Sequence, residues 1–210
     1  MNVKRSQVGW GFGIKWMLLN TVGWPIGALT GFVLASISQD GPWGGVLEEI
    51  LAYTVLGAVL GSVVGLMQWV VLRRQISKAG WWVLASATGL AVSIGAGTAV
   101  AALIDGSFGL GDLAVLCIWT AVFALGGALI GVLQQHILRQ QVSRASWWVL
   151  ASALGWALSI FVAGSFLVGR TMPDVTIARQ VGAVFVGGAV LGLVTLVAMV
   201  WLLRQPVPEA

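Results

Sequence analysis

The side chain best suited to chemistry in this chain is its only histidine, His136, in the segment LQQH at 133–136. An imidazole at this place can serve as the axial ligand of a haem or a chlorin. It can equally be an interfacial polar group that contacts lipid headgroups or water. We favour the second interpretation, because an internal repeat of the sequence places Val70 at the matching position. Pigment ligation by His136 is kept as an alternative.

Sequence patterns of catalytic sites are absent from this chain. It contains no HExxH, GxSxG, P-loop or CxxC motif. Asp40, Glu48 and Glu49 form one acidic stretch, which a solvated loop leading into a helix N-terminus explains. The single cysteine, Cys117, excludes a disulfide framework. We therefore expect no enzymatic activity, no metal site and no resident cofactor.

Composition indicates a protein of the lipid bilayer. The chain is 59% hydrophobic and 9% charged, with a mean hydropathy of +0.97. Six continuously apolar runs carry no charge: 16–39, 50–72, 79–104, 113–138, 145–169 and 180–203. Each exceeds the roughly 20 residues that cross a bilayer as a helix, and none alternates as barrel strands do. We predict an all-α integral membrane protein with six transmembrane helices in a single domain, 1–210.

The internal repeat is visible in the sequence itself. Segments 72–89 and 138–155 agree at 13 of 18 positions at an offset of 66, and Trp16, Trp82 and Trp148 have the same spacing. Each repeat holds two spans, so successive repeats keep one orientation. We predict three parallel helical hairpins, at about 10–75, 76–141 and 142–206, with pseudo-threefold symmetry about the membrane normal.

Small residues four apart predict where the helices pack. Such stripes let backbones approach closely in lipid, where helices gain little from hydrophobic burial. The glycines of these stripes are Gly23, Gly27, Gly31, Gly57, Gly61, Gly65, Gly89, Gly127, Gly131, Gly155, Gly188 and Gly192. Asn20, Ser86 and Ser152 are matched across the repeats on the same face, and we expect interhelical hydrogen bonds from them. A polar ring lining a pore is the alternative.

Tryptophan and arginine gather at one end of the predicted spans. Amphipathic indoles and basic side chains at headgroup level fix the depth of a helix in the bilayer. We expect this role for Trp16, Arg73, Trp81, Trp82, Arg139, Trp147, Trp148 and Arg204.

Charge sets the expected orientation. In a six-span topology nine basic residues lie on one side, and only Arg170 and Arg179 lie on the other. The excess of Lys and Arg marks the cytoplasmic side. We predict cytoplasmic termini in a bacterial inner membrane, either the cytoplasmic or a photosynthetic one. The basic residues lie in short loops beside membrane ends, so we expect no nucleic-acid partner.

The repeated segment, LRRQISKAGWWVLAS at 72–86 and LRQQVSRASWWVLAS at 138–152, resembles segments of uncharacterised multi-spanning membrane proteins of phototrophic bacteria. The resemblance extends over the hairpin repeats and includes the closing LLRQ at 202–205. It implies a membrane rich in photosynthetic or respiratory assemblies, and it assigns no activity to any residue.

These observations favour a non-catalytic accessory or structural subunit of a larger membrane complex. Its expected partners are the lipid bilayer and other membrane-protein subunits. One alternative is a channel or carrier for a neutral or lipophilic solute. A further alternative is a pigment-associated protein that uses His136.

The predicted orientation is testable with single cysteines introduced at positions 74–79 and 40–49 of a chain carrying Cys117→Ser. In intact cells, a membrane-impermeant maleimide should label only the 40–49 set, because positions 74–79 lie on the basic side. Labelling of positions 74–79 from outside would contradict the orientation.

Overall fold

The computed structural model describes residues 9–38, 45–108, 111–169 and 176–205, and Asp40 and Arg170 lie outside these ranges. The described residues form six α-helices: α1 Trp10–Ser38, α2 Val46–Leu72, α3 Trp81–Phe108, α4 Asp112–Leu138, α5 Trp147–Ser165 and α6 Ile177–Leu203. All six are long and apolar enough to cross a membrane. Even α5, with 19 residues, rises about 28 Å, close to the thickness of the hydrocarbon layer. The predicted all-helical fold, with six helices long and apolar enough to span a membrane, is confirmed.

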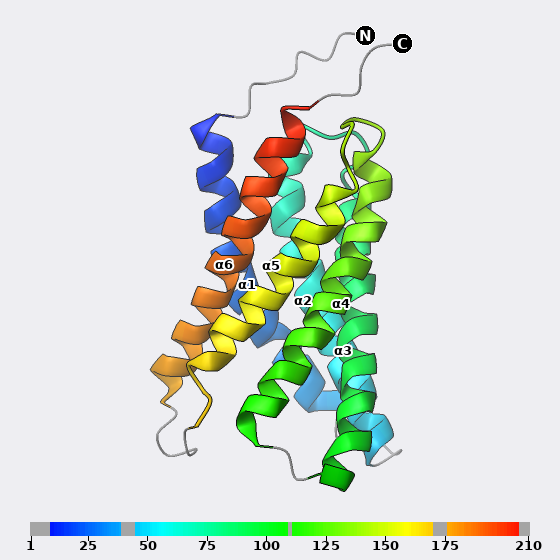
Figure 1. The fold of residues 1–210 in the computed structure, drawn as a ribbon, viewed down its shortest axis with the longest axis vertical. Coiled ribbons are helices and arrows are strands. Elements are labelled where there is room, and N and C mark those ends of the chain that lie inside the picture. Colours follow the sequence, from blue (N-terminus) through cyan, green and yellow to red (C-terminus); the bar gives the residue numbers. More distant parts are fainter. Residues whose placement is uncertain (1–8, 39–44, 109–110, 170–175, 206–210) are drawn as a thin grey trace.

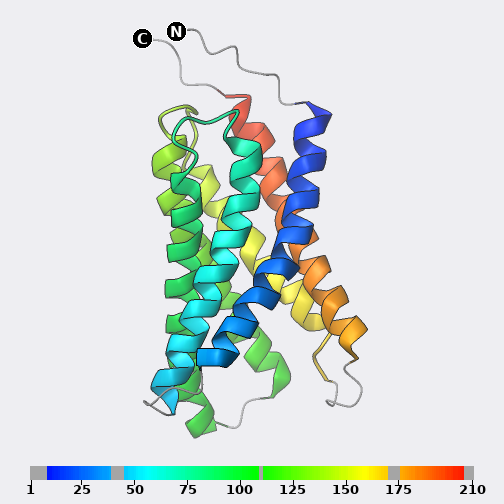
Figure 2. The ribbon, with the colours of Figure 1, turned by 180° about the vertical axis from the view of Figure 1, so that it is seen from behind.

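Five of the six helices extend beyond the uncharged runs that predicted them, and α5 alone lies within its run. The first begins at Trp10 and includes Lys15, and α3 continues past residue 104 to Phe108. A helix satisfies its own backbone hydrogen bonds, so it need not end where the apolar run ends. Pro25 lies inside α1. Figure 2 shows α1 changing direction partway along its length, as expected where a proline removes a backbone donor.

The helices form a closed ring in chain order. Within the described residues each helix packs against its neighbours in sequence, and α6 packs against α1. The helices alternate in direction, so α1, α3 and α5 begin at the end of the bundle where α2, α4 and α6 finish (Figure 1). We call this end the terminal face. The linkers 73–80 and 139–146 both lie there, and Gln141 Nε2 donates to Ser77 Oγ across them at 3.0 Å.

Side chains fill the interior of the ring in two apolar layers. The layer near the terminal face is built around Trp16, Trp82 and Trp148, which are almost completely buried. The deeper layer includes Trp24 and Trp156. Since Trp24 lies two turns beyond Trp16, the two layers are about 12 Å apart along α1.

The striped glycines lie where helices cross. A Cβ placed on any of the twelve would fall within 3.4 Å of an atom of another helix. At Gly61 it would lie 2.8 Å from the Cα of Ala87, and at Gly131 it would lie 2.7 Å from the Cα of Val149. Backbone atoms cannot move aside as side-chain ends do. These two positions therefore admit only glycine, because two helix backbones are in direct contact there.

We expect Gly61→Leu to destabilise the bundle by about 1–3 kcal/mol, because the leucine forces α2 away from α3. The matched control is Gly182→Leu in α6, where an added Cβ meets nothing within 4 Å. Both changes exchange a helical glycine for leucine, so their difference isolates the helix crossing. Unfolding by SDS titration in micelles measures it, and equal stabilities of the two variants would contradict the role of Gly61.

Candidate functional site

A chain of buried hydrogen bonds lies between the two apolar layers. It includes Gln68 of α2, whose side-chain amide joins three helices. The indole Nε1 of Trp82 on α3 donates to Gln68 Oε1 at 2.7 Å. Gln68 Nε2 in turn donates to Asn20 Oδ1 on α1 at 2.9 Å. Asn20 completes this part by donating from Nδ2 to the carbonyl oxygen of Trp16 at 2.8 Å.

The same arrangement recurs in the next helices along the chain. Trp148 Nε1 on α5 donates to Gln134 Oε1 on α4 at 2.7 Å, and Gln134 Nε2 donates to Ser86 Oγ on α3 at 2.9 Å. Ser86 Oγ donates to the carbonyl oxygen of Trp82 at 3.0 Å. The second glutamine therefore joins α3, α4 and α5, and Trp82 connects the two arrangements.

The third hairpin differs from the other two. The position five before Arg204, where the earlier hairpins carry Gln68 and Gln134, is Met199. The acceptor is instead Thr195, one turn away on α6, whose Oγ1 accepts from Trp16 Nε1 at 3.0 Å. Thr195 Oγ1 donates to the carbonyl oxygen of Leu191 at 2.6 Å. With this step the hydrogen-bond chain includes residues of all six helices.

The space enclosed by the hydrogen-bond chain is very small. A cavity of about 10 Å³ lies among Gln68, Ser86, Gln134, Ser152 and Thr195. That volume is close to the minimum for a single water molecule. The middle of the bundle is therefore closed by side chains at this level.

The interior offers little to a metal ion or to acid–base chemistry. Among the described residues, no group of three or more His, Cys, Asp or Glu side chains could hold a metal. The hydrogen-bond chain is built from indole, amide and hydroxyl groups, which do not ionise near neutral pH. These hydrogen bonds can fix the six helices in register, but they offer no group for acid–base catalysis.

The indole N–H of Trp24 is a buried donor that is not part of the hydrogen-bond chain. Trp24 Nε1 has no hydrogen-bond partner, although the side chain is only 5% exposed in the deeper layer. A buried unpaired N–H costs about 1–3 kcal/mol. Trp24 therefore contributes through packing, including its contact with Trp156 at 6.3 Å between ring centroids.

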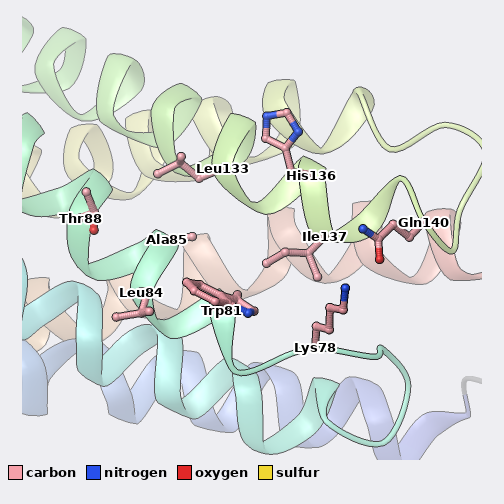
Figure 3. Close-up of a pocket in the computed structure, with 9 residues that line it drawn as sticks. All are labelled: Lys78, Trp81, Leu84, Ala85, Thr88, Leu133, His136, Ile137 and Gln140. Carbon is pink, nitrogen blue, oxygen red and sulfur yellow. The ribbon is translucent and has the colours of Figure 1, made fainter.

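The structure places His136 on the outside of the bundle. Its imidazole is exposed and lines a groove of about 380 Å³ between α3 and α4 at the terminal face. Figure 3 shows Lys78 and Gln140 at the loop end of this groove and Leu84 and Thr88 at the other. The histidine thus lies at the level of the basic loops, apart from the buried hydrogen-bond chain.

A larger cavity is at the opposite end of the bundle. It has a volume of about 690 Å³ and is lined mainly by apolar side chains of α4, α5 and α6, with Trp24 of α1. Asp112 and Gln180 are its polar lining residues near the helix ends. Asp112 also accepts a hydrogen bond from the backbone N–H of Gly169 at 3.0 Å. The cavity is of a size that accommodates a small lipophilic molecule.

The tryptophans predicted as interface anchors divide into two groups. Trp81 and Trp147 are 62% and 54% exposed, as a side chain in contact with headgroups requires. Trp16, Trp82 and Trp148 are 0–1% exposed and point their N–H groups at partners inside the bundle. This corrects their assignment as anchors. In each Trp-Trp pair the first indole faces outward and the second lies in the core, because successive helical positions differ by about 100°.

The three predicted anchor arginines, Arg73, Arg139 and Arg204, lie directly after the last residues of α2, α4 and α6 and are exposed. The guanidinium of Arg73 lies 5.0 Å from the ring centroid of Trp69, a cation–π contact at the end of α2.

The polar residues predicted at helix contacts are all buried. Asn20 and Ser86 each accept a hydrogen bond from the glutamine of another helix, and Ser152 lines the small central cavity. Sequence reasoning missed Gln68, Gln134 and Thr195 as their partners and as acceptors for the indoles. The signal for the glutamines was available in their matched positions in the repeat.

Comparison with known proteins identifies no relative: the chain matches no protein-family model, no curated protein and no solved structure.

The hydrogen-bond chain predicts unequal effects of two like substitutions. Trp82→Phe leaves Gln68 Oε1 without its donor, whereas Trp24→Phe removes an N–H that has no partner. Both remove the same volume from a buried indole. We expect Trp82→Phe to cost about 1 kcal/mol more, measured by SDS unfolding. Equal costs would show that the indole hydrogen bond contributes nothing to stability.

Proposed function

We propose that this protein is a non-catalytic accessory or structural subunit of a larger membrane complex in a bacterial inner membrane. The observation that carries the proposal is the closed interior. The buried polar groups of the hydrogen-bond chain bind one another, and only about 10 Å³ remains between them. A rigid bundle with a filled axis is suited to presenting its outer faces to partners.

Those outer faces are apolar along much of their length. Leu103 is 76% exposed, Leu125 is 74% exposed and Val197 is 64% exposed, on three different helices. Lipid covers such side chains in a membrane, and a partner helix can replace the lipid at little cost. The surfaces are therefore compatible with assembly into a complex.

The proposal includes three helical hairpins related by pseudo-threefold symmetry. Recurring contacts support it. Besides the two Trp–Gln arrangements, Ser93 Oγ donates to the carbonyl oxygen of Val122 at 2.9 Å, and Ser159 Oγ, at the matching position, donates to that of Gly187 at 2.7 Å. The first hairpin has Gly27 at this position, where the α1 and α2 backbones approach instead.

The proposal also places the terminal face in the cytoplasm. The support is the distribution of charge, since Arg73, Lys78, Arg139 and Arg144 lie at this face. The resemblance of the repeated segment to proteins of phototrophic bacteria suggests a complex of a photosynthetic or respiratory membrane as the setting.

A carrier for a lipophilic solute is the second candidate, and the 690 Å³ cavity beside Trp119 and Phe123 favours it. Such a solute would use this lateral cavity, because the axis between the helices is filled. A pigment-associated protein remains a further alternative, in which His136 would ligate the pigment from the α3–α4 surface.

Native purification tests these proposals. The tagged chain, expressed at its natural level and extracted in a mild detergent, should co-purify with other membrane proteins in fixed ratios by mass spectrometry. An unrelated six-span protein with the same tag controls for detergent carry-over. Recovery of the chain alone would contradict the subunit proposal. An absorption spectrum of the same sample reports any bound chlorin, and exchange of a fluorescent lipophilic probe between liposomes tests the carrier.

A further inference from the structure

Two grooves on the lipid-facing surface have the same construction. The first is the α3–α4 groove described above, with a volume of about 380 Å³. The second lies between α5 and α6 and has a volume of about 400 Å³. Both begin at the terminal face, where α3 and α5 start. We refer to them as the α3–α4 groove and the α5–α6 groove.

The odd-numbered helices and the linkers before them supply matching residues to the two grooves. Each groove has a basic residue, an exposed tryptophan, a leucine and an alanine in the same order along the chain. These residues occupy equivalent positions of the repeated segment and pair as Lys78 and Arg144, Trp81 and Trp147, Leu84 and Leu150, and Ala85 and Ala151.

The mouth of each groove is cationic. Lys78 and Arg144 are exposed at the linkers that precede α3 and α5. Gln140 and His136 add further polar groups at the α3–α4 groove (Figure 3). At the α5–α6 groove, the Arg144 guanidinium lies 5.8 Å from the ring centroid of Trp201. This cation–π contact holds the guanidinium over the mouth of the groove.

Beyond the mouth, each groove is an apolar trough along the helix axis. Trp81, Leu84 and Thr88 follow one another on α3 over about 10 Å, and Leu133 of α4 forms the opposite wall. In the α5–α6 groove Leu154 takes the place of Thr88, and Val194 and Val197 form the opposite wall. A ligand that fits this construction has an anionic head and an apolar chain.

No carboxylate competes for these cations among the side chains that the structure describes. Glu48 and Glu49 lie in the first turn of α2, and Asp112 lies in the first turn of α4. Those turns are at the end of the bundle opposite the terminal face (Figure 1). The described residues therefore supply no carboxylate to Lys78 and Arg144, and the anionic group that pairs with them comes from outside the described part of the chain.

We propose that the two grooves are binding sites for anionic phospholipids of the leaflet at the terminal face. The phosphate binds Lys78 in one groove and Arg144 in the other, beside Trp81 and Trp147 at headgroup level. One acyl chain lies in each trough, parallel to the chains of the surrounding lipid. A partner helix would fill a trough as well, but it would not require a cation at the same depth in both grooves.

Native mass spectrometry of the purified full-length chain tests this proposal. Micelles are supplemented with dioleoyl phosphatidylglycerol or with dioleoyl phosphatidylcholine, which has the same chains and no net charge. We expect two phosphatidylglycerol molecules to be retained, and phosphatidylcholine to bind at least about fivefold more weakly, as expected for loss of one basic contact per site. Lys78→Gln or Arg144→Gln should remove one retained lipid, and the double variant should remove both.

Two further sets of variants separate the grooves from general surface charge. The charge-matched control is Arg74→Gln with Arg204→Gln, two exposed residues of the same face that line neither groove. It should retain both lipids. Thr88→Trp and Leu154→Trp each fill a trough with an exposed side chain, and each should release one lipid without lowering the melting temperature. Glycerol phosphate, which has the head without the chains, should not displace the lipid.

Several results would overturn the proposal. Equal retention of the two lipids would remove the role of the cations, and equal losses in the control pair would assign it to general surface charge. Unchanged binding in the trough variants, or displacement by glycerol phosphate, would remove the acyl-chain site. These measurements use the isolated chain, so they are independent of whether it is a subunit of a complex.

Discussion

Hydrogen bonds from buried indoles to side-chain oxygens of a neighbouring helix are the interaction on which this bundle depends. In lipid, apolar side chains gain little by leaving the solvent for another helix, so association requires close packing and polar contacts. Trp82 to Gln68, Trp148 to Gln134 and Trp16 to Thr195 each join two helices that the connecting loops alone would leave free to slide. Loss of any of these acceptors would leave an indole N–H buried without a partner.

The glycine stripes and the large indoles serve complementary purposes around these bonds. Gly61 and Gly65 bring α2 against α3 at Ser86, directly below Trp82. Trp82, one turn before Ser86 on α3, is fully buried in the layer near the terminal face. Backbone contact therefore fixes helix spacing, whereas the hydrogen-bond chain fixes rotation and register.

Much of this arrangement could be predicted from the sequence, for identifiable reasons. Uncharged runs predict spans because a helix needs about 20 apolar residues to cross the hydrocarbon layer. Four-residue spacing of glycines predicts contact because it places them on one helix face. The matched positions of Gln68 and Gln134 mark the two residues as equivalent, but their pairing with Trp82 and Trp148 could not be predicted, because sequence spacing does not show which indole lies within hydrogen-bond distance. The composition of a Trp-Trp pair predicts interface anchoring for both residues, although helical geometry turns Trp81 outward and Trp82 inward.

The third hairpin shows which feature of the hydrogen-bond chain is kept when the glutamine is replaced. Met199 replaces the glutamine, yet the indole of Trp16 still finds an oxygen, because Thr195 on the next turn of the same face supplies it. The requirement is therefore an acceptor for the indole, and the residue type and exact position can vary. The amide's second function, donation to Asn20 or Ser86, has no counterpart from Met199, which has no donor, so fewer bonds join α5 to α6 at this level. The interior is nevertheless closed there by Met199 and Leu202, both fully buried. Because the axis is filled even where the polar pattern changes, the cationic and apolar groups open to a ligand lie on the outside, in the grooves beside Lys78 and Arg144.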